Sequence, residues 1–368
     1  MWRQRPTGLP RHRAAALAPA AKSTTLLPQR AYFTSSAMRK ERELVTTPPP
    51  AITALGLRKS YGDKIVLNGI DLDVPSGRIW SLLGPNGAGK TTMVQILSTL
   101  IRPDAGTVHV AGHDLAKDPD AVRRSIGVTG QFAAVDEMLT GEENLLLMGD
   151  LHHLDRRASR RRANELLKQF DLEDAGKKVA STYSGGMRRK LDLAMTLVGN
   201  PRIIFLDEPT TGLDPRSRHT MWEIIRGLVA NEGITIFLTT QYLEEADELA
   251  DRIAVLDHGK LVAQGTPDEL KSLVPGSHIL LTFGDITELD AAVRVLGESA
   301  RDDQALTLRV PSNGDLGEMR SLLDRLDAAS VVAKNLSIHT PDLDDVFLTL
   351  TGRPAAENEA ENAEKETV

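Results

Sequence analysis

One glycine-rich segment places the strongest constraint on what this 368-residue chain can fold into. It follows the apolar run Arg78–Leu83 and precedes the helical pattern Thr92–Leu100. Glycines let backbone N–H groups approach a phosphate where a Cβ would obstruct them, and the N-terminus of the next helix adds partial positive charge. Lys90 supplies a point charge to the outer phosphates, and the Thr91 hydroxyl can ligate Mg²⁺. The predicted phosphate-binding residues are Gly84, Pro85, Asn86, Gly87, Ala88, Gly89, Lys90, Thr91 and Thr92.

Composition excludes several classes of protein. With 41% hydrophobic and 26% charged residues, the chain lies in the ordinary globular range, so a packed core is expected. It contains no cysteine, which excludes disulfides, thiolate metal sites and cysteine nucleophiles. No apolar run approaches the roughly 18 residues that would cross a bilayer, so we expect no transmembrane segment of its own.

The charge is unevenly distributed. Residues 1–40 contain six Arg and two Lys without any acidic residue, so the net charge of −7 for the whole chain becomes −15 for the remainder. Binding of duplex nucleic acid normally requires a basic face. We therefore predict no nucleic acid partner.

Changes in composition divide the chain into four parts. Residues 1–50 are predicted to be a disordered leader and linker, 51–274 a sheet domain, 275–352 a small α+β domain and 353–368 an acidic tail. Two explanations of the leader stay open. It is Arg-rich and acid-poor, as in an organellar transit peptide over residues 1–37. Alternatively, translation starts at Met38 and the preceding residues are a gene-model extension, which we favour because such composition arises easily in translated non-coding sequence.

Continuous apolar runs predict strands that are buried on both faces. Ile203–Leu206, Ile234–Leu238 and Arg252–Leu256 alternate with helical stretches, which indicates an α/β fold with a mostly parallel sheet between helices. Residues 140–178 are predicted to be almost entirely helical, with apolar positions at helical spacing in Asn144–Met148 and Ala163–Phe170. We therefore expect a helical insert at about residues 132–183. Shorter β-type runs at Ile52–Leu57 and Lys64–Val74 precede the glycine-rich segment.

The region after Pro275 has its own pattern of alternating elements. We predict strands at residues 278–283, 305–310 and 331–338, and helices at 287–296, 316–326 and 343–350.

Two carboxylates, Asp207 and Glu208, follow the buried run Ile203–Leu206. Acidic residues at strand ends are common, and simple capping of the next element is the alternative interpretation. Beside a phosphate-binding loop, we expect Asp207 to hold Mg²⁺ through water and Glu208 to orient and deprotonate the attacking water.

A second anion-binding helix start is predicted at Ser184, Gly185 and Gly186, before the helical run Leu191–Val198. Ser184 can cap the helix, and the glycines leave backbone N–H groups accessible. One nucleotide needs only one such cradle from its own chain. The second cradle therefore suggests contact with a phosphate held by another subunit, with an ordinary helix start as the alternative.

In order along the chain, these motifs resemble the nucleotide-binding subunit of an ATP-binding cassette (ABC) transporter over about residues 51–270. The resemblance adds Tyr61, Gln131 and the segment Thr211-Gly-Leu-Asp214-Pro to the motifs above. Three longer segments resemble the daunorubicin-resistance exporter ATPases of actinobacteria; these are Gly127–Glu137, Tyr183–Ala194 and Thr340–Gly352.

The resemblance implies a P-loop NTPase fold that uses ATP and Mg²⁺. Tyr61 would stack on adenine, Gln131 would sense Mg²⁺ and the membrane subunit, and Asp214 would belong to the dimer contact. The implied Mg²⁺ ligands are Thr91, Gln131 and Asp207.

The resemblance also implies partners and a location. Two copies would form a homodimer around two ATP molecules and drive a separate membrane permease of the ABC-2 type. The exported molecule would be a hydrophobic drug or lipid. We expect a peripheral protein on the cytoplasmic face of the plasma membrane, or a mitochondrial one if residues 1–37 are a transit peptide.

One position departs from the general family pattern. Most cassettes have a switch histidine after the strand that corresponds to Ile234–Leu238, where this chain has Gln241. Glutamine can donate a hydrogen bond to a γ-phosphate but does not titrate near neutral pH. We expect Gln241 to act with Glu208 in catalysis. A soluble cassette ATPase that is not coupled to transport is the alternative function, and a catalytically idle cassette is opposed by the presence of Lys90 and Glu208.

Overall fold

The structure is a computed structural model that describes residues 49–131, 133–274, 278–297, 300–312, 315–339 and 341–352. Nearly all of the predicted leader and the whole of the predicted acidic tail, 353–368, lie outside these described residues. None of the helices in these ranges combines the length and the apolar composition that a membrane span requires.

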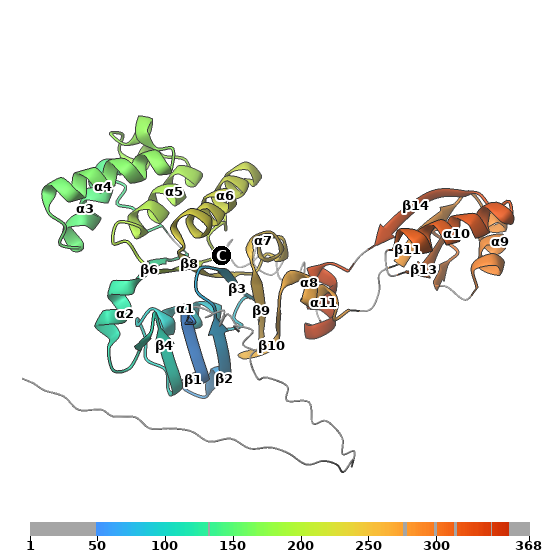
Figure 1. Ribbon diagram of the computed structural model, residues 1–368, viewed down its shortest axis with the longest axis horizontal. Coiled ribbons are helices and arrows are strands. Elements are labelled where there is room, and N and C mark those ends of the chain that lie inside the picture. Colours follow the sequence, from blue (N-terminus) through green and yellow to red (C-terminus); the bar gives the residue numbers. More distant parts are fainter. Residues whose placement is uncertain are drawn as a thin grey trace, which may run out of the picture. The chain divides into compact units, whose positions relative to one another are not determined.

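The predicted α/β fold is confirmed by a six-stranded sheet with the order β10-β9-β3-β8-β7-β6 (Figure 1). Five strands are parallel and β10 pairs with β9 in the antiparallel sense. The central strands are buried along their whole length because helices cover both faces of the sheet. The strands are β3 (Ile79–Leu83), β6 (Ile126–Thr129), β7 (Ile203–Asp207), β8 (Thr235–Thr240), β9 (Arg252–Asp257) and β10 (Lys260–Gly265).

A second, antiparallel sheet has the order β2-β1-β4-β5. Its strands are β1 (Ile52–Tyr61), β2 (Lys64–Val74), β4 (Ala105–Val110) and β5 (His113–Asp114). β1 and β2 are joined by a tight turn in which Gly62 has a φ of +57°, so they pair with each other instead of entering the parallel sheet. We did not predict β4, because most of its residues are exposed and it lacks an apolar run.

Helix α1 (Lys90–Leu97) joins the two sheets. Met93, Val94 and Ile96 lie in one buried cluster with Ile70 of β2 and Phe205 of β7. Helix α2 (Pro119–Ser125) adds Val122 to the same cluster. The loop that precedes α1 is therefore held between two rigid layers.

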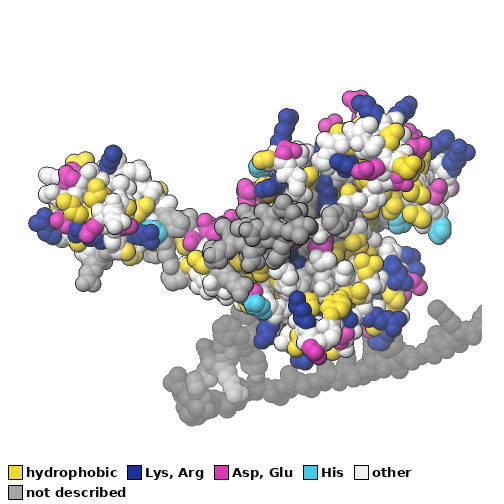
Figure 2. All heavy atoms as spheres, turned by 180° about the vertical axis from the view of Figure 1, so that it is seen from behind, with side chains coloured by type: hydrophobic (Ala, Val, Ile, Leu, Met, Phe, Trp, Pro, Cys, Tyr) yellow, Lys and Arg dark blue, Asp and Glu magenta, His cyan; other side chains and the backbone are white. Residues whose placement is uncertain are grey.

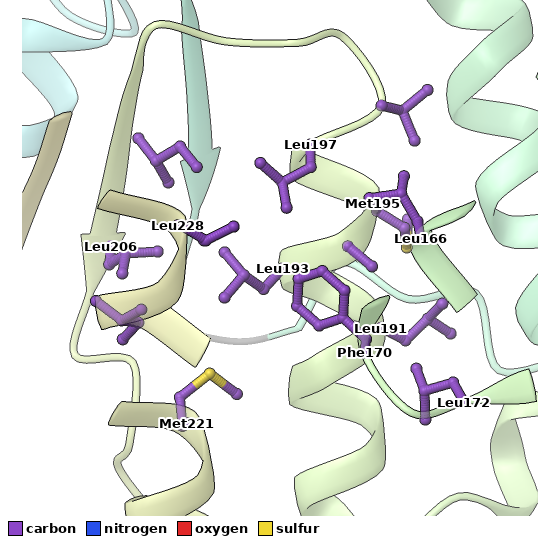
Figure 3. Close-up of a cluster of buried hydrophobic side chains, with 14 of the residues drawn as sticks. Leu166, Phe170, Leu172, Leu191, Leu193, Met195, Leu197, Leu206, Met221 and Leu228 are labelled. Atoms are coloured by element: carbon purple, nitrogen blue, oxygen red, sulfur yellow. The ribbon is translucent and has the colours of Figure 1, made fainter. Parts of the chain in front are cut away.

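The opposite face of the parallel sheet packs against α5 (Gly185–Thr196), α6 (Pro215–Glu232) and α7 (Leu243–Leu249). The helical insert contains α3 (Gly141–Leu151) and α4 (Arg156–Gln169), followed by short 3₁₀ turns at Glu173–Ala175 and Ala180–Thr182. Figure 3 shows how α5 connects the two regions: Leu193 lies between Phe170 at the end of α4 and Leu206 of β7.

The region after α8 (Pro267–Lys271) forms a four-stranded antiparallel sheet with the order β12-β13-β11-β14. The order of elements is that of a split βαβ fold, and the predicted α+β class is confirmed. The elements are β11 (His278–Phe283), α9 (Ile286–Leu296), β12 (Ala300–Asp302), β13 (Thr307–Pro311), α10 (Leu316–Ala328) and β14 (Ala333–His339). Ile279, Leu281 and Phe283 of β11 point into its core with Leu289 of α9 and Leu326 of α10.

The last helix, α11 (Leu343–Thr351), differs from the predicted grouping with residues 275–352. Leu343, Val346 and Phe347 form one apolar stripe that packs with Leu270 of α8 and Ala246 of α7. Helical spacing predicts such a stripe but does not identify the surface that it covers. The split βαβ domain is thus inserted between α8 and α11, which share one cluster.

We predict that Phe170→Ala lowers the free energy of unfolding by about 3–5 kcal/mol, because this side chain is only 1% exposed and packs in the cluster between α4 and α5. Urea unfolding followed by circular dichroism measures the change. The control is Leu100→Ala, at a side chain that is 69% exposed, where we expect a change within about 0.5 kcal/mol. Equal effects of the two substitutions would contradict the packing described here.

Candidate active site

The glycine-rich loop lies so close to two strands that only glycine fits at its ends. A Cβ on Gly84 would lie 2.3 Å from the carbonyl oxygen of Leu256 in β9. Gly89 has a φ of +114°, and a Cβ there would lie 2.9 Å from the carbonyl oxygen of Val66 in β2. Glycine at these two positions therefore lets the loop backbone pack directly against β9 and β2.

Lys90 is the buried cation of this loop. Its side chain is 5% exposed, and Nζ donates to the carbonyl oxygens of Gly84 at 2.8 Å and Pro85 at 3.2 Å. Nζ also lies 3.4 Å from Oε1 of Glu208. Burial lowers the pKa of Lys90, and the Glu208 and Asp207 carboxylates oppose that shift. The two carboxylates thus favour the charged ammonium that would attract a phosphate.

A cavity of about 400 Å³ opens beside the loop, within the size range of ligand pockets. It brings together the loop, β2, the segment after β6 and the residue after β7. Its lining residues are Lys64, Val66, Asn86, Gly87, Gly89, Lys90, Thr91, Thr92, Gln131 and Glu208. Eight of these lining residues are predicted site residues, and they come from the loop or follow β6 and β7. Lys64 and Val66 were not predicted, because their position opposite the loop depends on how the sheets pack.

The two predicted carboxylates lie at the end of β7 in different environments. Asp207 is the last residue of the strand, and the hydroxyl of Thr239 in β8 donates to its Oδ1. Glu208 has a φ of +49°, an uncommon conformation for a residue with a side chain. Its backbone N–H donates to the carbonyl oxygen of Thr239 at 3.1 Å. This left-handed turn takes Glu208 out of the strand and into the lining of the cavity.

A buried carboxylate that we did not predict, Glu245 of α7, supports the loop after Glu208. Oε1 of Glu245 accepts hydrogen bonds from the Thr210 hydroxyl at 2.7 Å and from Nε1 of Trp222 at 3.2 Å. Burial raises the pKa of Glu245, and these donors oppose the shift. Glu245 is one of four acidic residues in α7, and nothing in the sequence distinguishes it from the other three.

Tyr61 and Gln241 lie outside the described lining of the cavity. Tyr61 is half-exposed at the turn between β1 and β2, with its ring centroid 5.4 Å from Nζ of Lys59. Gln241 is partly buried and follows β8 directly. Among the residues that the structure describes, neither side chain contributes to the cavity that Glu208 lines.

The predicted second cradle also lies away from this cavity in the described chain. Ser184 caps α5, with its Oγ accepting from the Met187 N–H at 3.2 Å. Ser184 and Gly185 are exposed. Asp214 caps α6 and accepts from the backbone N–H and the hydroxyl of Ser217. The Ser217 hydroxyl, together with the backbone donors, lowers the pKa of Asp214.

Comparison with known proteins identifies the family of the cassette. The ABC transporter family model matches residues 67–211. A solved ATP-binding subunit of an ABC transporter has a TM-score of 0.55 and 30% identity, covering 61% of this chain and 92% of its own. A dimeric, post-hydrolysis ATP-binding cassette with bound ADP and phosphate has a TM-score of 0.53 and 27% identity, covering 58% of this chain and 98% of its own.

Curated relatives match over most of the chain. The daunorubicin resistance ATP-binding protein DrrA3 of Streptomyces coeruleorubidus is 50% identical over 82% of this chain and 96% of its own length. The daunorubicin/doxorubicin resistance ATP-binding protein DrrA of Streptomyces peucetius is 47% identical over 87% of this chain and 98% of its own length. The Nod factor export ATP-binding protein I of Ralstonia nicotianae is 38% identical over 83% of this chain and 94% of its own length. The chain therefore belongs to the ABC transporter ATPases, in the group of the daunorubicin resistance ATP-binding proteins.

Proposed function

We propose that this ATPase powers the export of a hydrophobic drug or lipid through a separate permease of the ABC-2 type. The cavity that joins Lys90, the glycine-rich loop and Glu208 carries the ATPase part of this proposal. The export part is supported by relatives whose names refer to drug resistance and Nod factor export. We propose a location at the cytoplasmic face of the plasma membrane. Residues 51–274 would be the cassette and 275–352 an accessory region whose last helix, α11, packs with α7 and α8.

Lys90 and Glu208 divide the chemistry of hydrolysis between them. Lys90 is held by two carbonyl oxygens of the loop and binds the outer phosphates of ATP. Glu208 lines the same cavity and accepts the proton of the attacking water. Nζ of Lys90 lies 3.4 Å from Oε1 of Glu208. A phosphate that attracts Lys90 would therefore weaken this ion pair and leave the Glu208 carboxylate available as the base.

The residues present fit a bound Mg²⁺. Thr91 and Gln131 line the cavity, and Asp207 lies one residue before Glu208. Hydroxyl, amide and carboxylate oxygens are the donors that Mg²⁺ prefers. When bound with ATP, Mg²⁺ would neutralise the charge of the phosphates.

Two copies of the chain would complete each site. Ser184 and Gly185 are exposed and lie outside the described cavity lining, so their helix N-terminus is free to meet a phosphate held by the partner. Asp214 is exposed on the neighbouring α6 cap and belongs to the same proposed dimer contact. Tyr61 would stack on adenine beside the turn of β1 and β2, and Gln241 would contact the γ-phosphate.

We predict that Glu208→Gln reduces ATP turnover by about 10²–10⁴ while ATP binding persists, because the amide cannot accept the proton. Turnover is measured on the purified dimer, and binding by equilibrium titration. Glu223→Gln, at an exposed position of α6, is the matched control and should turn over like the wild type. A Glu208→Gln rate within a few-fold of wild type would exclude Glu208 as the base.

We predict that inactive subunits complement each other when Lys90→Ala and Ser184→Arg chains are mixed. Each homodimer has two damaged sites, whereas a heterodimer has one intact composite site and one doubly damaged site. ATPase activity should partly recover in heterodimers isolated with two affinity tags. Heterodimers without recovered activity would show that Ser184 does not act on the partner's nucleotide.

We predict that Gln241→Ala loses substantial activity, because an unpaired phosphate oxygen in a closed site is costly. Gln241→His should remain active and gain a pH dependence between about pH 6 and 7.5, since imidazole titrates near its unperturbed pKa of about 6.5 whereas an amide does not. The three ATPase profiles are compared at saturating Mg-ATP. An alanine variant as fast as the wild type would show that Gln241 does not contact the γ-phosphate.

A further inference from the structure

A buried ion pair on α5 has no place in the mechanism above. Nη1 of Arg189 lies 3.2 Å from Oδ2 of Asp192, and the two residues are 7% and 3% exposed. Removing both charges from water costs several kcal/mol per ion, so such a pair is weak evidence for stability alone. Its contacts indicate what else it does.

The Arg189 guanidinium donates to the backbone at the end of β7. Nε lies 2.9 Å from the carbonyl oxygen of Pro209, and Nη2 lies 3.4 Å from those of Asp207 and Glu208. These three residues are the proposed Mg²⁺ ligand, the proposed base and the residue that follows it. Because Glu208 has a left-handed backbone conformation, these hydrogen bonds hold a turn that would otherwise be unfavourable.

The same pair holds the segment that carries Gln131. Nη1 of Arg189 donates to the carbonyl oxygen of Gly130 at 2.7 Å. Oδ1 of Asp192 accepts from the backbone N–H of Ala134 at 3.0 Å. The two charged side chains thus contact the chain on both sides of Gln131.

We infer that Arg189 and Asp192 are positioning residues that hold the Gln131 segment and the Glu208 turn in register, on the helix that begins at Ser184. This inference rests on the proposed roles of Gln131, Glu208 and Ser184. A guanidinium is suited to the task because its planar group presents five N–H donors in a fixed arrangement. A movement of the Gln131 segment would then be transmitted through the Arg189 guanidinium to the turn at Glu208 and to the helix capped by Ser184.

The first test separates positioning from stability. Arg189→Met and Asp192→Leu each leave one buried charge unpaired and should destabilise the protein, whereas the double variant removes both charges and should recover most of the stability. If the pair positions the site, the double variant still shows kcat lower by about 10- to 100-fold, with KM for ATP changed by less than about threefold. Arg189→Lys should retain more stability than activity, because one ammonium cannot replace the planar fork.

The matched control is the exposed pair of Arg226 on α6 and Glu248 on α7, 2.7 Å apart. The double variant Arg226→Gln with Glu248→Gln should keep wild-type kcat and KM. A stable Arg189→Met, Asp192→Leu variant with wild-type kcat would overturn the inference. So would a raised KM with unchanged kcat, since that pattern reports binding and not positioning.

Amide hydrogen exchange gives a readout that does not depend on turnover. In the wild type, Mg-ATP should slow exchange both around Ala134 and around Glu208, whereas in the double variant the slowing around Ala134 should be lost. If Mg-ATP slows exchange at both places in a wild type that does not hydrolyse ATP, the proposed function is contradicted but the positioning role is not. Unchanged protection at Ala134 in the double variant, with normal wild-type hydrolysis, would contradict only the positioning role.

Discussion

The contact between Lys90 and Glu208 is the interaction on which the rest of the site depends. It joins the loop between β3 and α1 to the end of β7, and both partners are almost fully buried. A buried ammonium remains charged only where carboxylates and carbonyl oxygens compensate for lost hydration. The two sheets, with α1 between them, supply the rigid frame that holds these groups at this distance.

The chain after β7 is held by buried polar groups from two directions. Arg189 of α5 binds its carbonyl oxygens, and Glu245 of α7 binds the Thr210 hydroxyl. Such groups are costly to bury unless their hydrogen bonds are made. Because several such groups surround Glu208, hydrogen bonds as well as apolar packing determine the position of this turn. Elsewhere on the cassette, acidic and basic side chains are interspersed over the face in Figure 2.

The C-terminal region contains a domain with its own core, followed by a helix, α11, that packs against the cassette. The split βαβ domain has its own buried cluster, whereas α11 adds Leu343, Val346 and Phe347 to the cluster of α7 and α8. Both ends of the inserted domain are therefore attached to helices that pack together. Because α7 directly follows the Gln241 segment, this cluster lies next in sequence to a proposed catalytic residue.

Local spacing and apolar runs were enough to predict the α/β class, the glycine-rich loop, and the two carboxylates Asp207 and Glu208 at the end of a buried strand. Tertiary structure alone decided that β1 and β2 form a separate antiparallel sheet, that Lys64 and Val66 line the cavity, and that α11 packs on α8. It also decided that Arg189 and Asp192 contact both sides of Gln131. The physical reason is that these contacts join residues far apart in the chain, and hydrophobic periodicity identifies a buried face without identifying its partner.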